Sequence, residues 1–95
     1  MDFHHGATLL SAYVRHAEAD PYADIIGLKE KVGHVRLSLL RFGETEAQHV
    51  AADLACAAVV DFLMHRDEDW RLRDVKVALD LLRTGADHEL LNAAP

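Results

Sequence analysis

Apolar side chains recur at every third or fourth position through most of this chain, and that spacing restricts it to helices. The clearest case is residues 25–42, where steps of three and four residues alternate without interruption. The apolar positions of this series are Ile25, Leu28, Val32, Val35, Leu39 and Phe42. Such a series forms one stripe along a helix and favours packing nearly parallel or antiparallel to another helix. Strands are not indicated, because the sequence has neither hairpin-turn dipeptides nor sustained alternation of polar and apolar residues.

Turn residues divide the chain into predicted helices. Asp20 and Pro21 are expected to end the first helix and begin the second, because an aspartate caps free N–H groups and proline suits the first helical position. Gly43 and Gly85 are expected to end the second and fourth helices. The predicted helices lie at about 7–19, 21–42, 46–65 and 69–84, with a tail at 86–95.

The third predicted helix has a recognisable start and an unusual composition. Thr45 is followed three residues later by Gln48, which is the spacing of a capping box. Alanines are dense along the helix and allow another helix to approach closely. Cys56, the single cysteine, sits among these alanines and is interpreted as a small buried residue rather than a reactive thiol.

These elements predict an all-α fold, a small up-and-down bundle of about four helices formed by all 95 residues as one domain. Apolar residues make up 51% of the sequence, a high fraction for so small a domain, so part of the apolar surface is expected to be buried in a homodimer. The N-terminus lacks the features of a signal peptide, and the longest apolar run, residues 54–60, is too short to span a bilayer. We therefore expect a cytoplasmic protein without a membrane partner.

The formal charge of −6 is unevenly distributed along the sequence. Residues 28–41 carry four basic side chains and one acidic side chain, a local charge of +3, whereas residues 42–65 carry four acidic side chains and no lysine or arginine. Solvated faces of two adjacent helices explain this pattern most simply, and a surface that steers a complementary protein is the alternative. An acidic chain repels the phosphate backbone, so no nucleic-acid ligand is expected.

We expect a non-enzymatic protein that acts by binding a partner protein as a regulator, adaptor or inhibitor, as small acidic helical proteins of bacteria, phages and mobile elements often do. The sequence has no phosphate-binding loop, paired cysteines or nucleophile motif, so neither a catalytic residue nor a cofactor is predicted. Two groups are predicted to bind the partner, the basic residues of the second helix and the acidic turn before the fourth helix with its tryptophan. They are Lys29, Lys31, Arg36, Arg41, Asp67, Glu68, Asp69 and Trp70.

Two other interpretations remain open. Glu46 and His49 have the Glu-x-x-His spacing that places both side chains on one helical face, as in di-iron carboxylate bundles, and a homodimer would supply two copies of it to a metal. Residues 28–41 resemble a repressor-type helix-turn-helix with Gly33 at the turn, which would imply DNA binding. However, Lys29 occupies a position where such motifs bury a small residue, and the apolar series predicts one continuous helix.

Overall fold

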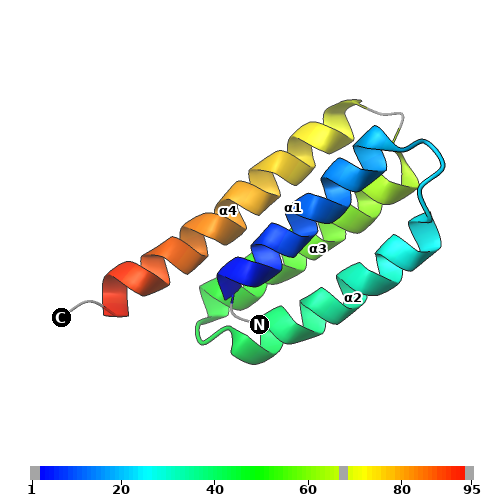
Figure 1. Cartoon of the computed structure of the whole chain (residues 1–95). Helices are drawn as coiled ribbons and strands as arrows, with labels where there is room; N and C mark the ends of the chain where they lie inside the picture. The colour runs from blue at the N-terminus through cyan, green and yellow to red at the C-terminus, as the bar shows by residue number, and fades with distance from the viewer. Residues whose placement is uncertain (1–2, 67–68, 94–95) are drawn as a thin grey trace.

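The computed structural model describes residues 3–66 and 69–93, with side chains described for residues 5–66 and 71–84. Four helices run alternately up and down along the chain (Figure 1). Within the described residues no strand occurs. The predicted all-α four-helix bundle is therefore confirmed. Its helices are α1 Phe3–Ala19, α2 Ile25–Phe42, α3 Glu46–Met64 and α4 Asp69–Ala93.

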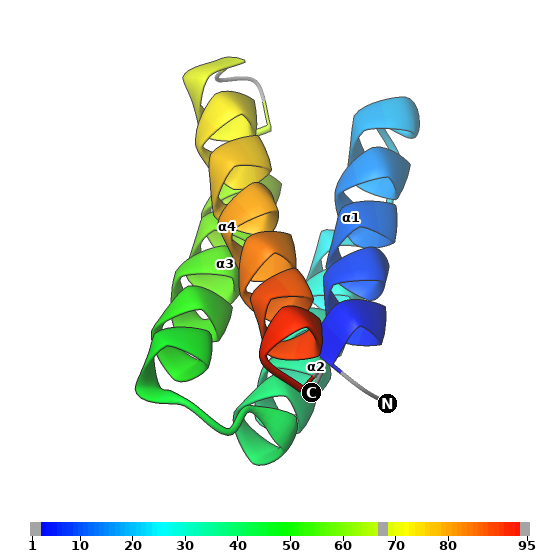
Figure 2. The same ribbon diagram turned by 90° about the vertical axis from the view of Figure 1, so that its left-hand side faces the viewer.

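Each helix contributes one apolar stripe to a shared core. The helix α3 makes its most extensive contact with α4, as Figure 2 shows, and both α1 and α3 also contact α2. In the described part of the chain, α2 and α4 do not contact each other, so α3 lies between them. Burying a side chain as large as leucine or valine contributes roughly 2 kcal/mol to folding. The largest fully buried side chains are Leu10, Leu39, Leu82, Val32, Val59 and Val75.

The connection between α1 and α2 differs from the prediction, because α2 begins at Ile25 rather than at residue 21. The Asp20 carboxylate accepts a hydrogen bond from the N–H of Tyr22 at 2.9 Å, which forms a turn after α1 instead of capping α2. The cap is Asp24, whose Oδ1 accepts from the N–H of Gly27 at 3.0 Å. A Cβ atom on Gly27 would lie 2.5 Å from the Asp24 carboxylate, so a larger residue there would require this side chain to shift.

Both terminal helices are longer than predicted. The helix α1 begins at Phe3 and includes Gly6, where a Cβ atom would lie 2.5 Å from the Leu39 side chain, so this glycine lets α1 approach α2 closely. The helix α4 continues through Gly85 to Ala93, and the predicted tail is helical as far as that residue. No described glycine has the left-handed conformation that ends helices. One interior glycine costs only about 1 kcal/mol, which is too little to stop a helix.

The capping box predicted at the start of α3 is confirmed. The Thr45 hydroxyl accepts from the N–H of Gln48 at 3.1 Å, and the Gln48 Oε1 accepts in return from the N–H of Thr45 at 3.1 Å. The same Oε1 also accepts from the N–H of Glu44 at 2.7 Å. The buried Gln48 side chain therefore satisfies backbone groups of the α2–α3 turn that would otherwise lack partners.

Replacing Thr45 with alanine is expected to lower the free energy of unfolding by about 1 kcal/mol, because the N–H of Gln48 loses its acceptor. The variant Thr45→Ser keeps the hydroxyl and is expected to stay within about 0.5 kcal/mol of the original protein. Urea unfolding followed by circular dichroism measures both differences. Equal stability of the alanine and serine variants would show that the hydroxyl does not stabilise this helix end.

One guanidinium group joins the end of α3 to the α1–α2 connection. Arg66 donates from Nη1 to the carbonyl oxygens of Ala17 and Asp20, and from Nη2 to that of Pro21, each at 3.0 Å. The Ala17 carbonyl would ordinarily accept from the N–H four residues later, but that residue is Pro21, which has none. Arg66 therefore supplies the donor that the proline removes, and it places a positive charge at the C-terminus of α1.

Candidate functional site

The four basic residues predicted to bind a partner all lie on α2 with exposed side chains, but they do not form one surface. Lys29 and Arg36 are seven residues, or two turns, apart and line a groove between α2 and α3. Lys31 and Arg41 do not line this groove. The structure therefore divides the predicted basic set, and only Lys29 and Arg36 share a site.

The second predicted group, the acidic turn with its tryptophan, spans the start of α4. Asp67 and Glu68 lie outside the described residues. Asp69 and Trp70 are the first two residues of α4, and only their helical backbone is described. The role of this group in partner binding stays a prediction.

The His49 side chain of the predicted metal motif has a structural partner. Its Nε2 donates to the carbonyl oxygen of Gly43 at 2.8 Å across the α2–α3 turn, which leaves Nδ1 as the free ring nitrogen. Gly43 ends α2 as predicted, with φ −68° and a non-helical ψ of 133°, and a Cβ atom there would lie 2.9 Å from the His49 ring. The Glu46 side chain is exposed. Over the described residues, no group of three or more histidine, cysteine, aspartate or glutamate side chains is placed to hold a metal.

The resemblance of residues 28–41 to a helix-turn-helix is wrong. The helix α2 is continuous from Ile25 to Phe42, and no turn interrupts it at Gly33. Gly33 is exposed, and a Cβ atom added to it would meet no atom within 4 Å. The apolar series that predicted one continuous helix is confirmed, since its four central residues are buried.

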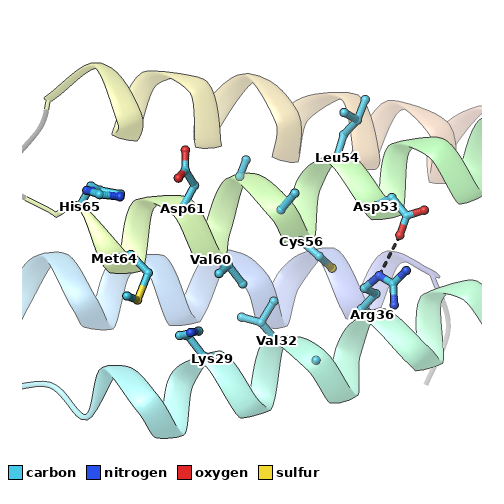
Figure 3. A pocket seen from close by; sticks show the side chains of 13 residues that line it. Lys29, Val32, Arg36, Asp53, Leu54, Cys56, Val60, Asp61, Met64 and His65 are labelled. Atoms are coloured by element: carbon cyan, nitrogen blue, oxygen red, sulfur yellow. Dashed lines mark hydrogen bonds and ion pairs between the residues drawn. The ribbon is translucent and has the colours of Figure 1, made fainter.

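A groove with a volume of about 970 Å³ lies between α2 and α3 (Figure 3). It is open to solvent along the outside of the bundle. Larger apolar side chains, Leu54 and Met64, also line the groove and are 54% and 55% exposed. The remaining apolar lining combines small and medium-sized residues, namely Val32, Gly33, Cys56, Ala57, Ala58 and Val60.

The two sides of this groove carry opposite charges. Lys29 and Arg36 project from α2, and Asp53 and Asp61 from α3. The Arg36 Nε donates to the Asp53 Oδ1 at 2.8 Å, with both side chains about half exposed. Asp61 pairs with Arg71 of α4. Lys29 makes no ion pair with any described residue, so the basic side holds one cation available to a ligand.

The helix α3 exposes large apolar side chains although it lies at the centre of the bundle. Its exposed side carries Val50, Leu54 and Met64, each more than half exposed. Its buried side includes the small residues Ala52, Ala55 and Cys56, which allow the neighbouring helices to approach. A helix that is apolar on all sides is expected to be covered on all sides. One side of α3 is not covered by the residues whose side chains the structure describes. The buried residues of α3 are Gln48, Ala52, Ala55, Cys56, Val59, Phe62 and Leu63.

The exposed side of α3 was not among the predicted partner-binding residues, although the sequence contains a signal for it. Val50, Leu54, Ala57, Asp61 and Met64 follow one another in alternating steps of four and three residues. This spacing marks a single side of a helix, as the series in α2 does. The signal was obscured because apolar residues also occupy most of the other positions of α3.

Cys56 is the small buried residue that the sequence predicted. It lines the groove between α2 and α3 but is only 2% exposed. Burial raises the pKa of its thiol from 9.0 to about 11, while nearby Arg36 lowers this pKa and Asp53 raises it by smaller amounts. The thiol is therefore protonated at neutral pH, which makes it a poor nucleophile.

Within the described residues, α3 is the one helix whose length and composition would allow it to cross a membrane. The core helix of a bundle meets the same criterion. In this structure α3 packs against each of the other three helices, and 39% of the span is buried among them.

No protein-family model, no curated protein and no solved structure matches this chain. The interpretation of the groove therefore depends on its own shape, charges and burial.

Proposed function

We propose that this protein acts without catalysis, as a regulator, adaptor or inhibitor that binds a partner protein in the α2–α3 groove. The uncovered apolar side of α3 is the observation that supports this proposal most directly. Covering apolar surface is favourable by about 25 cal/mol per Å². Val50, Leu54 and Met64, each more than half exposed, would gain that stabilisation from a partner protein.

The shape and charges of the groove favour a protein partner over a small molecule. Small-molecule sites are enclosed and bury most of their ligand, whereas this groove is open along its length between two antiparallel helices. An amphipathic helix fits such a groove by placing its apolar side on the floor. The opposite charges of the two sides would fix its orientation and steer its approach.

The ionisable side chains of the groove do not support a catalytic alternative. Cys56 and His65 are the nucleophile and the base among its lining residues. Cys56 lies in α3 and His65 directly follows this helix, nine residues later or about 13 Å at 1.5 Å per residue, far beyond the hydrogen-bond distance that a nucleophile and its base require. Figure 3 shows them well separated along α3. The Cys56 thiol is also protonated at neutral pH, because its pKa is raised to about 11.

The variant Gly33→Glu tests the groove as the binding surface. It places a charged side chain in the groove without a clash inside the chain, since a Cβ atom at this position meets nothing within 4 Å. Ala12→Glu adds the same charge at an exposed position of α1 outside the groove and is the matched control.

Both variants are expected to retain the helical circular dichroism spectrum of the original protein. Used as bait in a lysate of the native cells, the original protein and Ala12→Glu are expected to retain the same partner protein, and Gly33→Glu at least about tenfold less of it, as for a charge placed at the centre of an interface. Equal recovery by all three baits would contradict binding in the groove.

A further inference from the structure

The charges of the groove are arranged so that its two sides complement each other. Arg36 lies level with Asp53, because their side chains pair across the antiparallel helices α2 and α3. Lys29 precedes Arg36 by seven residues, and Asp61 follows Asp53 by eight, distances of about 10 and 12 Å along the helices. Lys29 therefore lies level with Asp61, as Figure 3 shows. Each cation of the basic side therefore has one carboxylate of the acidic side at the same height, although the Asp61 carboxylate points toward α4, where it pairs with Arg71.

We propose that the partner in the groove is a second copy of this chain, related by a twofold axis that runs along the groove. This inference rests on the proposed function, because it takes the groove as a protein-binding surface. Rotation about such an axis exchanges the basic and acidic sides and preserves height along the helices. The α2 helix of each copy then lies over the α3 helix of the other. Arg36 of one copy meets Asp53 of the other, and Lys29 meets Asp61.

This arrangement gives every charge of the groove an additional partner. A guanidinium has five N–H donors and a carboxylate accepts several hydrogen bonds, so Arg36 and Asp53 of the two copies can form a ring of alternating charges. Lys29, which has no ion pair within the described residues, gains a carboxylate. A twofold axis across the groove would instead place α3 on α3 and α2 on α2, with like charges in contact.

Gly33 provides a second and independent reason to expect that a helix of another chain packs closely against α2. Glycine in the middle of a helix weakens it, and such a glycine usually allows another backbone to approach. Within one chain Gly33 has no such role, because a Cβ atom there would meet nothing within 4 Å. Gly33 and the exposed Ala57 lie on opposite sides of the groove, near its middle. In the proposed dimer they let α2 of one copy approach α3 of the other.

Reversal of one charged side at a time tests this geometry with purified protein. The basic-side variant carries Lys29→Glu and Arg36→Glu, and the acidic-side variant carries Asp53→Lys and Asp61→Lys. The matched control carries Lys31→Glu and Arg41→Glu, the same charge change on α2 outside the groove. All substituted positions are exposed, so each variant is expected to keep the helical circular dichroism spectrum.

Analytical ultracentrifugation is expected to give the original protein and the control a mass of twice 10.6 kDa. Each reversed variant alone is expected to form dimers at least about 100-fold more weakly, because like charges then face each other at both symmetry-related contacts. An equimolar mixture of the two reversed variants restores opposite charges at every contact and is expected to form dimers of one copy each. A twofold axis across the groove predicts a different result for the basic-side variant. Its α2 helices would face each other with like charges, as those of the original protein would, so dimerisation would not weaken.

A monomeric original protein at all concentrations would overturn self-association, and unchanged dimerisation of the basic-side variant would overturn the twofold axis along the groove. The proposed function and the proposed dimer can fail independently of each other. If the purified chain is monomeric but Gly33→Glu still loses a lysate partner, the groove binds a different protein. If Gly33→Glu and the reversed variants change neither the mass nor the lysate partner, both proposals are wrong.

Discussion

Replacing Arg66 with alanine is expected to lower the free energy of unfolding by about 3 kcal/mol. The guanidinium donates three hydrogen bonds at 3.0 Å to carbonyl oxygens of Ala17, Asp20 and Pro21. Hydrogen bonds that involve a charged group contribute about 1.5–3 kcal/mol each, and three bonds made by one partly exposed side chain give less than their sum. For a domain of this size, the expected loss lowers the melting temperature by about 15 °C.

Two further substitutions show whether the geometry of Arg66 or only its charge matters. Arg66→Lys keeps a positive charge at the C-terminus of α1 but lacks the planar set of donors, so an intermediate loss is expected. Arg73→Ala removes an exposed arginine of α4 and is expected to change stability by less than about 0.5 kcal/mol. Thermal unfolding followed by circular dichroism measures all three. Arg66→Ala and Arg73→Ala with equal melting temperatures would contradict the role assigned to the three hydrogen bonds.

The helices could be predicted from the sequence where one side of the helix is clearly more apolar than the other. The series in α2 identified the helix and its buried residues, because polar side chains occupy most of the other positions. The α3 capping box was also predictable, since it depends on Thr45 and Gln48, which are only three residues apart. Both features are local, and tertiary contacts did not override them.

The orientation of α3 could not be predicted, because a helix that is apolar on all sides gives no preferred direction. Val50 and Leu54 are larger than Ala52 and Ala55, so size alone would place them inside. The structure does the opposite and packs the alanines against the other helices. Close approach of helices favours the small side chains of Ala52 and Ala55 at the contact and leaves Val50 and Leu54 outside, available to another chain.

The remaining errors come from choices that local sequence leaves open. Asp20 and Asp24 are both suitable helix caps, and in the structure Asp24 caps α2 while Asp20 forms the preceding turn. The contacts of Arg66 join residues between 45 and 49 positions apart, so no local pattern could indicate them. The sequence shows only that Pro21 lacks an N–H and leaves a carbonyl of α1 without its usual partner, and it does not show which residue supplies the donor.

The stability of this protein is expected to fall as the pH rises from about 9 to about 11, by about 3 kcal/mol more than in the variant Cys56→Ala. Burial raises the pKa of the Cys56 thiol from 9.0 to about 11, so the folded chain holds this proton more tightly than the unfolded chain does. Below pH 9 the thiol is protonated in both the folded and the unfolded state, and the buried thiol makes its full contribution to the free energy of unfolding. Between the two pKa values the unfolded chain releases the proton and the folded chain keeps it, which favours unfolding. Two pKa units correspond to about 3 kcal/mol.

Urea unfolding at pH values below, within and above this interval measures the effect in both proteins. The alanine variant has the same lysines and tyrosines, so its own pH dependence accounts for every group except the thiol. The stability advantage of the original protein is therefore expected to shrink with rising pH. Parallel pH dependences would show that the thiol ionises as readily in the folded chain as in the unfolded one. That result would contradict the close cover of Cys56 by α2, which forms the basic side of the groove, and would require a looser contact between α2 and α3 than the structure has.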